Sequence, residues 1–131
     1  MFTAKSPVEF VHPEFGVLSL DSGLWSGKVQ RDGIDIRFCI AGTSTAPDDG
    51  LLGQLRDLLG RFAEVERAAM DFLRMQAPAL RSREFTFYSI DFLWEEKPDA
   101  FAMEFRLAGD EYGIWRVEFD RGQPKSVGRD D

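Results

Sequence analysis

The chain has 131 residues, 44% of them hydrophobic and 13% aromatic, which predicts one globular domain with its own core. Its 23 acidic and 16 basic residues give a net charge of −7. This charge argues against binding to nucleic acid or to an anionic membrane, because either surface attracts a concentrated basic face. One cysteine and one histidine exclude an internal disulfide and a zinc site built from four Cys and His ligands. Neither a signal sequence nor an apolar run of roughly 18 to 20 residues is visible, so we expect a cytoplasmic protein.

Hydrophobic periodicity changes twice along the chain. Apolar and polar residues alternate over residues 15–41, apolar residues follow a helical spacing over 47–76, and alternation returns over 84–120. The sequence therefore predicts three strands, one long helix and three more strands, in a single domain over residues 1–131. We expect an α+β two-layer sandwich, in which an antiparallel sheet of about six strands carries the helix on one face.

A hairpin is predicted in the first block by Asp32-Gly33, because both positions of a two-residue turn favour positive φ. A third strand over FGVLSL is expected to precede this hairpin. The turn sets three directly opposed pairs, which are Val29 with Ile36, Gly27 with Phe38 and Trp25 with Ile40. The large apolar residues then share one face of the sheet. The other face carries the polar residues Gln30, Asp35, Lys28, Arg37, Ser26 and Cys39.

The expected helix begins after Thr45, which we assign as its N-cap, with Asp48 three residues later. Leucines and other apolar residues recur at three- and four-residue steps and predict one broad buried stripe. Gly60 costs about 1 kcal/mol relative to Ala inside a helix, so it marks a candidate break. Pro78 is expected to end the helix.

Two hairpins are predicted in the last block from the pairing of apolar residues. A loop over residues 96–99 sets the pairs Trp94–Phe101, Phe92–Met103, Ile90–Phe105 and Tyr88–Leu107. A second turn at GDEYG sets the pairs Leu107–Trp115, Phe105–Val117 and Met103–Phe119. The three tryptophans of the chain are expected on the apolar face, as part of the core.

On the opposite face this register places three carboxylates, Asp91, Glu104 and Glu118, in a row across neighbouring strands. Directly opposed like charges destabilise a sheet, so the row needs an explanation. The acids could pair diagonally with Arg106 and Arg116 as a solvated charge mosaic. Alternatively, they could bind Mg²⁺ or Ca²⁺, or form an acid/base pair. A fourth interpretation makes the face a protein-binding surface that uses the two arginines.

Other candidate residues carry less chemistry. His12 is a lone histidine beside a proline, and Cys39 lies on the charged side of a strand without a histidine to activate it. Residues 42–50 resemble a phosphate loop only in their small polar residues and lack its spaced glycines and its lysine. We therefore assign no catalytic residue and no cofactor.

The stretches LWSGKVQRDGIDIRFCI and GIWRVEFDRGQPKSV carry a resemblance that spans nearly the whole chain. They resemble small uncharacterised bacterial domains that share a W-x-G strand, a hairpin, one helix and a terminal aromatic strand followed by a glycine turn. Some of these families are found beside polymorphic toxins, which implies an immunity-type role. The resemblance defines no catalytic residue.

The sequence thus favours a non-enzymatic protein-binding domain, including an immunity-type protein whose acidic charge suits a basic toxin or nuclease. The alternative is a small metal-dependent or acid/base enzyme that uses Asp91, Glu104 and Glu118. An exposed edge strand would also allow two copies to pair as a homodimer.

Overall fold

The computed structural model describes residues 8–94, 97, 99–110 and 113–130. In these residues eight strands, two α-helices and a short 3₁₀ helix follow one another. They are β1 (Val8–His12), β2 (Gly16–Asp21), β3 (Leu24–Arg31), β4 (Ile34–Ala41), α1 (Asp49–Leu59), α2 (Phe62–Gln76), η1 (Pro78–Leu80), β5 (Phe85–Phe92), β6 (Phe101–Leu107), β7 (Ile114–Asp120) and β8 (Gln123–Asp130).

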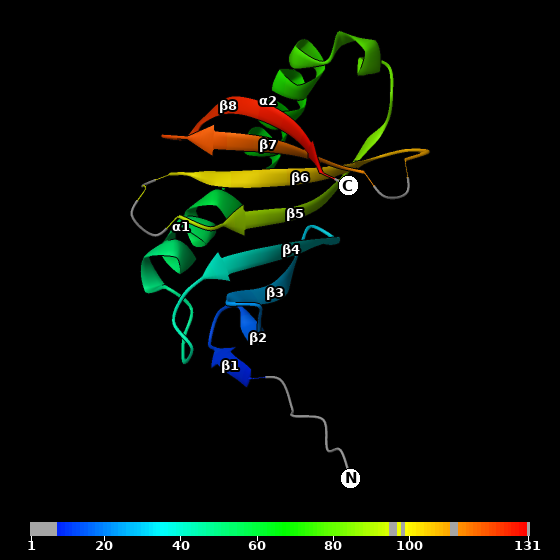
Figure 1. Cartoon of the computed structure of the whole chain (residues 1–131). Coiled ribbons are helices and arrows are strands. Elements are labelled where there is room, and N and C mark those ends of the chain that lie inside the picture. The colour runs from blue at the N-terminus through cyan, green and yellow to red at the C-terminus, as the bar shows by residue number, and fades with distance from the viewer. Residues whose placement is uncertain (1–7, 95–96, 98, 111–112, 131) are drawn as a thin grey trace.

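All eight strands form one sheet, and their order in the sheet is their order in the chain. Every neighbouring pair is antiparallel except β4 and β5, which are parallel. Parallel neighbours need a crossover connection, and here the crossover contains both helices. Figure 1 shows the two helices on one side of the twisted sheet, behind the strands in that view. The expected six-stranded antiparallel sheet with one long helix is therefore wrong, because the sheet is mixed, has eight strands and is covered by two shorter helices.

The two missed strands lie at the two edges of the sheet. β8 reads QPKSVGRD and follows a tight turn in which Arg121 and Gly122 both have positive φ, 54° and 77°. Its single apolar residue, Val127, produces no period-two pattern. β1 pairs with β2 but lies ahead of the first alternating block. None of the described side chains of β1 and β8 is buried, so these edge strands carry little of the apolar pattern that identifies a central strand.

The predicted long helix is broken at Gly60, the residue that the sequence marked as a candidate break. α1 ends at Leu59 and α2 begins at Phe62, and Gly60 donates its N–H to the carbonyl of Arg56 at 3.3 Å. α2 ends ahead of Pro78, as expected. The cap assignment to Thr45 is wrong, because Asp48 caps α1 and its Oδ2 accepts the N–H of Leu51 at 3.0 Å.

The β3–β4 hairpin has the expected register. Trp25 lies opposite Ile40, Gly27 opposite Phe38 and Val29 opposite Ile36, and both turn residues, Asp32 and Gly33, have positive φ. This prediction succeeded because a two-residue turn fixes both the register and the face of each side chain.

The registers predicted for β5, β6 and β7 are shifted by two residues. Ile90 lies opposite Met103 rather than Phe105, and Trp115 lies opposite Phe105 rather than Leu107. A shift of two keeps every side chain on its face, so the apolar side of β6 and β7 was still identified correctly. Tyr88 was assigned to the apolar side, but a β-bulge between Phe87 and Ser89 makes it an extra residue on β5. The predicted pair Trp94–Phe101 does not form, since β5 ends at Phe92, and the predicted loop partly lies outside the described residues.

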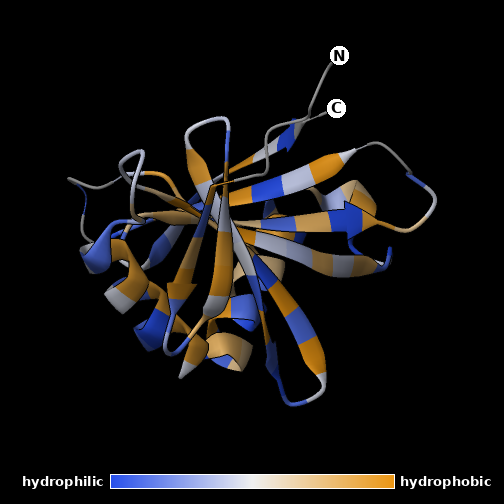
Figure 2. Ribbon diagram, turned by 90° about the horizontal axis from the view of Figure 1, so that it is seen from below, coloured by the Kyte–Doolittle hydropathy of each residue, from blue (hydrophilic) through white to orange (hydrophobic). Residues whose placement is uncertain are grey.

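The core lies between the sheet and the helices. It includes fully buried side chains from the central strands and from both helices, among them Trp25, Ile40, Leu55, Leu73, Phe92 and Met103. Figure 2 shows how hydrophobic and hydrophilic residues alternate along the strands, so that one face of the sheet is apolar and the other polar. In the described part of the chain, no helix is both long and apolar enough to span a membrane.

Candidate functional site

The face of the sheet opposite the helices, here called the open face, carries two rows of directly opposed residues. The first row runs from β2 to β7 through Ser19, Ser26, Cys39, Asp91, Ala102 and Glu118. The second row runs from β3 to β7 through Lys28, Arg37, Ser89, Glu104 and Arg116. The middle of the first row is made of small side chains, and the second row is charged at both of its ends.

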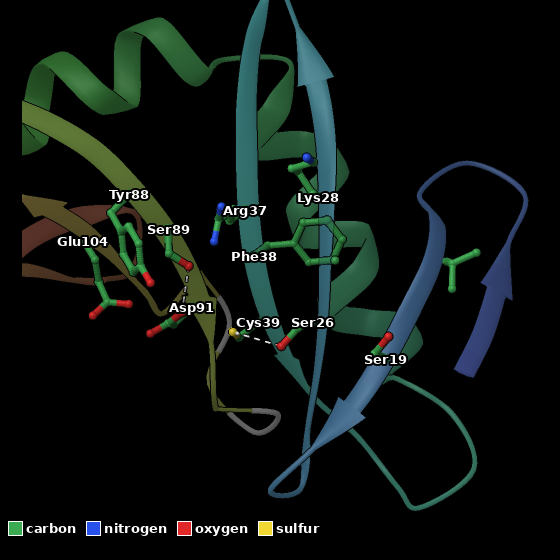
Figure 3. Close-up of a pocket in the computed structure, with 12 residues that line it drawn as sticks. Ser19, Ser26, Lys28, Arg37, Phe38, Cys39, Tyr88, Ser89, Asp91 and Glu104 are labelled. Carbon is green, nitrogen blue, oxygen red and sulfur yellow. Dashed lines mark hydrogen bonds between the residues drawn. The ribbon is translucent and has the colours of Figure 1, made fainter. Parts of the chain in front are cut away.

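A cavity of about 560 Å³ is hollowed into this face. Its lining comes from β2 to β6 and includes the first row from Ser19 to Asp91, the second row from Lys28 to Glu104, and Val17 and Tyr88. Serine and cysteine in the first row leave room that longer side chains would fill, and the bulge brings Tyr88 to the cavity beside Ser89. Figure 3 shows Tyr88, Ser89 and Asp91 on one side of the hollow and Ser19 on the other. The volume lies within the usual range of small-ligand sites.

The acidic side of the cavity is organised by Arg116. Its Nη1 lies 3.2 Å from Asp91 Oδ2 and 3.4 Å from Glu104 Oε2, and its Nε lies 3.7 Å from Glu118 Oε1. Ser89 Oγ also donates to Asp91 Oδ1 at 3.3 Å. The three predicted acids are thus brought together, although they do not form a single row, because Ala102 separates Asp91 from Glu118 and Glu104 belongs to the other row.

The acids pair with Arg116, as the charge-mosaic interpretation expected, but Glu104 lies directly opposite this arginine rather than diagonally. The side chains of Asp91 and Glu104 are only 11% and 12% exposed, so these pairs are largely buried and not solvated. Arg116 supplies positive charge between the carboxylates, where a metal ion would otherwise have to supply it. Arg106 has a different position and lies over the ring of Tyr88, with its Cζ 4.4 Å from the ring centroid. Over the described ranges, no group of three or more His, Cys, Asp or Glu side chains has the geometry of a metal site.

The basic side of the cavity is formed by Lys28 and Arg37, which lie directly opposite each other on β3 and β4. Lys28 Nζ is 3.7 Å from Asp35 Oδ2, a solvated ion pair that contributes little. Arg37 has its Cζ 6.0 Å from the centroid of the Tyr88 ring. Within the part of the chain that the structure describes, no carboxylate lies within ion-pair distance of Arg37.

Cys39 lies on the cavity floor with its Sγ 3.5 Å from Ser26 Oγ. Burial raises the pKa of this thiol above its ordinary value, the hydrogen bond with Ser26 opposes that effect, and the nearby carboxylates of Asp91 and Glu104 add to it. At neutral pH the thiol is therefore protonated, and only a thiolate is an effective nucleophile.

His12 and residues 42–50 have local structural roles. His12 Nδ1 accepts hydrogen bonds from the backbone N–H groups of Glu14 and Phe15 at 3.0 and 3.2 Å, which closes the turn between β1 and β2. In the 42–50 segment, Thr43 Oγ1 accepts the N–H of Ala46 at 3.2 Å, and the carbonyl of Thr43 accepts the indole N–H of Trp25 at 2.9 Å. Neither feature lines the cavity.

The sequence placed Lys28, Arg37 and Cys39 on the polar face but did not identify them as part of a site. The opposition of Lys28 and Arg37 follows from the hairpin register alone, so this pair was a signal that could have been recognised. The contribution of Tyr88 to the cavity could not have been recognised from the sequence, since it depends on the bulge in β5. The serines of β2 and β5 become neighbours of β3 and β4 only through the strand order.

No protein-family model, curated protein or solved structure matches this chain.

Proposed function

We propose that this protein is a non-enzymatic binding domain and that its open face receives a partner protein. The observation that carries the proposal is an apolar pair beside the cavity. Val11 and Val17 lie directly opposite each other on β1 and β2, and they are 73% and 53% exposed. Val17 also lines the cavity. Apolar side chains gathered next to a hollow are typical of interaction sites.

Further along the open face, on β4 to β6, lie residues that protein interfaces favour. Tyr88, Arg37 and Arg106 combine an aromatic ring with two guanidinium groups, and tyrosine and arginine are enriched at the residues that dominate binding energy. A cavity can accept a side chain of the partner, while the valines exclude water around it. An immunity-type role, in which the partner is a toxin, is one form of this function and is supported by the sequence resemblance.

The chemistry of the open face supports binding over catalysis. The carboxylates of Asp91 and Glu104 are occupied by Arg116, and the Cys39 thiol is held in its protonated form. General acid/base catalysis needs a group that is free to exchange a proton with a substrate, and nucleophilic catalysis needs an activated one. The open face therefore carries side chains suited to binding a partner, whereas its carboxylates and its thiol are not activated for catalysis.

Photo-crosslinking in the cells that express the protein tests this proposal. A photoreactive amino acid is placed at Val17 in one variant and at Met75 in a matched control. Met75 is also apolar and 62% exposed, but it lies on α2, on the helical side of the sheet. We expect a discrete adduct with one protein from position 17 and none from position 75. Adducts of equal yield from both positions, or none from position 17, would contradict the proposal.

A further inference from the structure

We propose that the cavity on the open face is a binding site for a carboxylate group, which Arg37 and Lys28 hold, and that the site favours a single negative charge over two. The carboxylate could belong to a small free acid or to an Asp or Glu side chain of the partner, and this second form rests on the proposed function. Both sources present the same chemistry to the same atoms.

The first argument is the placement of the two cations. Arg37 and Lys28 are directly opposed on neighbouring strands, an arrangement that destabilises a sheet when it is not compensated. Only Asp35 lies within ion-pair distance of Lys28 among the described residues, and none of their carboxylates lies that close to Arg37. Folding therefore gains little from this pair. A bound anion would supply the missing negative charge.

The second argument is the match between the lining and a carboxylate with a small apolar body. An arginine guanidinium can donate two parallel hydrogen bonds to the two oxygens of a carboxylate. Ser19 and Ser26 add hydroxyl groups to the cavity, and the ring of Tyr88 beside Arg37 offers a surface for an aromatic or aliphatic body. Figure 3 shows the Arg37 side chain on the side of β4 that faces Tyr88 and Ser89 of β5.

The preference for one charge follows from the acids at the other side of the cavity. Asp91 and Glu104 line the same hollow, and they share Arg116 as a counter-ion. These acids weaken the net attraction of an anion to Arg37 and Lys28, and the cost of removing an ion from water rises more steeply with its charge than that attraction does, so a dianion gains less than a monoanion. The net charge of −7 on the chain acts in the same direction.

The test is a titration of the isolated protein, followed by amide chemical shifts in NMR spectra. Benzoate is the monoanionic probe, sulfate at equal ionic strength is the dianionic probe, and benzyl alcohol is the neutral probe with a similar body. We expect saturable shifts at Ser26, Arg37 and Ser89 with benzoate, and at least about tenfold weaker binding of the other two probes. Equal or tighter binding of sulfate, equal binding of benzyl alcohol, or no saturable shift with benzoate would overturn the inference.

Substitution separates the binding site from folding. Arg37→Gln should weaken benzoate binding at least about tenfold, while the control Arg67→Gln, an equal change of charge on the exposed side of α2, leaves it unchanged. Arg37→Gln should also leave the melting temperature unchanged or raise it, because it removes a like-charge contact. Lys28→Gln gives a second variant with the same expected loss of binding. Unchanged benzoate affinity in both cavity variants would overturn the inference.

These results are distinguishable from those of the cross-linking experiment. Adducts from position 17 without benzoate binding would contradict the carboxylate site and support the protein-binding function. Benzoate binding without adducts would contradict binding of a protein partner and support a site for a free small acid.

Discussion

Arg116 on β7 contacts Asp91 on β5 across the whole width of β6. The Nη1–Oδ2 distance is 3.2 Å, and the two side chains are only 18% and 11% exposed. The same Nη1 lies 3.4 Å from Glu104 Oε2 on the intervening strand. One guanidinium therefore compensates two nearly buried carboxylates, which explains how the sheet tolerates acids on adjacent strands.

Replacing this guanidinium should destabilise the protein strongly. In Arg116→Met the carboxylates of Asp91 and Glu104 lose their shared counter-ion while they remain largely buried. We expect the free energy of unfolding to fall by about 2–3 kcal/mol, as measured by urea denaturation at pH 7.

Lys125→Met is the matched control for that substitution. Lys125 Nζ lies 3.8 Å from Asp120 Oδ2, and both side chains are solvated. Its loss should change the free energy of unfolding by no more than about 0.5 kcal/mol. Equal effects of the two substitutions would show that Arg116 does not compensate the buried acids.

The contact between Gly27 and Phe38 predicts a second effect on stability. A Cβ at position 27 would lie 2.5 Å from Cζ of the Phe38 ring, whose side chain is fully buried. Gly27→Ala should therefore lower the free energy of unfolding by about 1–3 kcal/mol, because the ring has to move within the core. Gly53→Ala in α1 meets no atom within 4 Å and should raise stability by about 0.5–1 kcal/mol. Thermal or urea unfolding of both variants measures the difference, and a stable Gly27→Ala variant would refute the close contact.

The environment of Cys39 predicts slow thiol chemistry. Burial is the main cause of its raised pKa, and the carboxylate of Asp91 adds to it. At pH 8 the native thiol should react with an aromatic disulfide reagent at least about tenfold more slowly than in the urea-unfolded chain. Asp91→Asn should speed the native reaction, because it removes one cause of the raised pKa. A native rate equal to the unfolded rate would contradict the assignment.

The same shift affects stability at alkaline pH. The folded thiol keeps its proton to a higher pH than the unfolded thiol, whose ordinary pKa is 9.0. Its contribution to stability is therefore complete below pH 9.0 and is lost as the pH rises through the folded pKa. Cys39→Ser should reduce this alkaline loss in urea denaturation at several pH values. An unchanged pH profile would argue against a raised pKa.

The contact between Glu14 and Arg56 joins the β1–β2 turn to α1. Arg56 Nε donates to Glu14 Oε1 at 2.6 Å, and this hydrogen bond is the main cause that lowers the pKa of Glu14 below 4.5. We expect the Glu14 carboxyl to titrate below its ordinary value in carbon-detected NMR, and Arg56→Gln to return its pKa toward that value. The stabilisation is present above the unfolded pKa and disappears as the pH falls through the lowered pKa. A pKa that is equal in the wild type and in Arg56→Gln would exclude the contact.

The parts of the fold that the sequence predicted well are those fixed by local chemistry. Asp32-Gly33 determined the β3–β4 register, and Pro78 lay just beyond the end of α2. The registers of β5, β6 and β7 were inferred only from apolar pairing, which is satisfied equally well after a shift of two residues. The bulge at Tyr88 and the parallel pairing of β4 with β5 depend on long-range packing and left no local signal.

The candidate site was predictable to the same extent. The convergence of Asp91, Glu104 and Glu118 followed from their shared face, and the facing of Arg37 and Lys28 followed from the hairpin. That these two groups lie on opposite sides of one cavity depends on the crossover that places β5 beside β4, and this could not be read from the sequence.

The most direct test of the central claim, that the open face binds the partner, compares two charge reversals. The protein captured from position 17 is purified, and its affinity for Arg37→Glu and for Arg67→Glu is measured by calorimetry. Arg37 lines the cavity, whereas Arg67 lies on the exposed side of α2. We predict that Arg37→Glu loses at least about tenfold in affinity while Arg67→Glu binds like the wild type. Wild-type affinity in Arg37→Glu, or a loss confined to Arg67→Glu, would place the interface elsewhere and contradict the account.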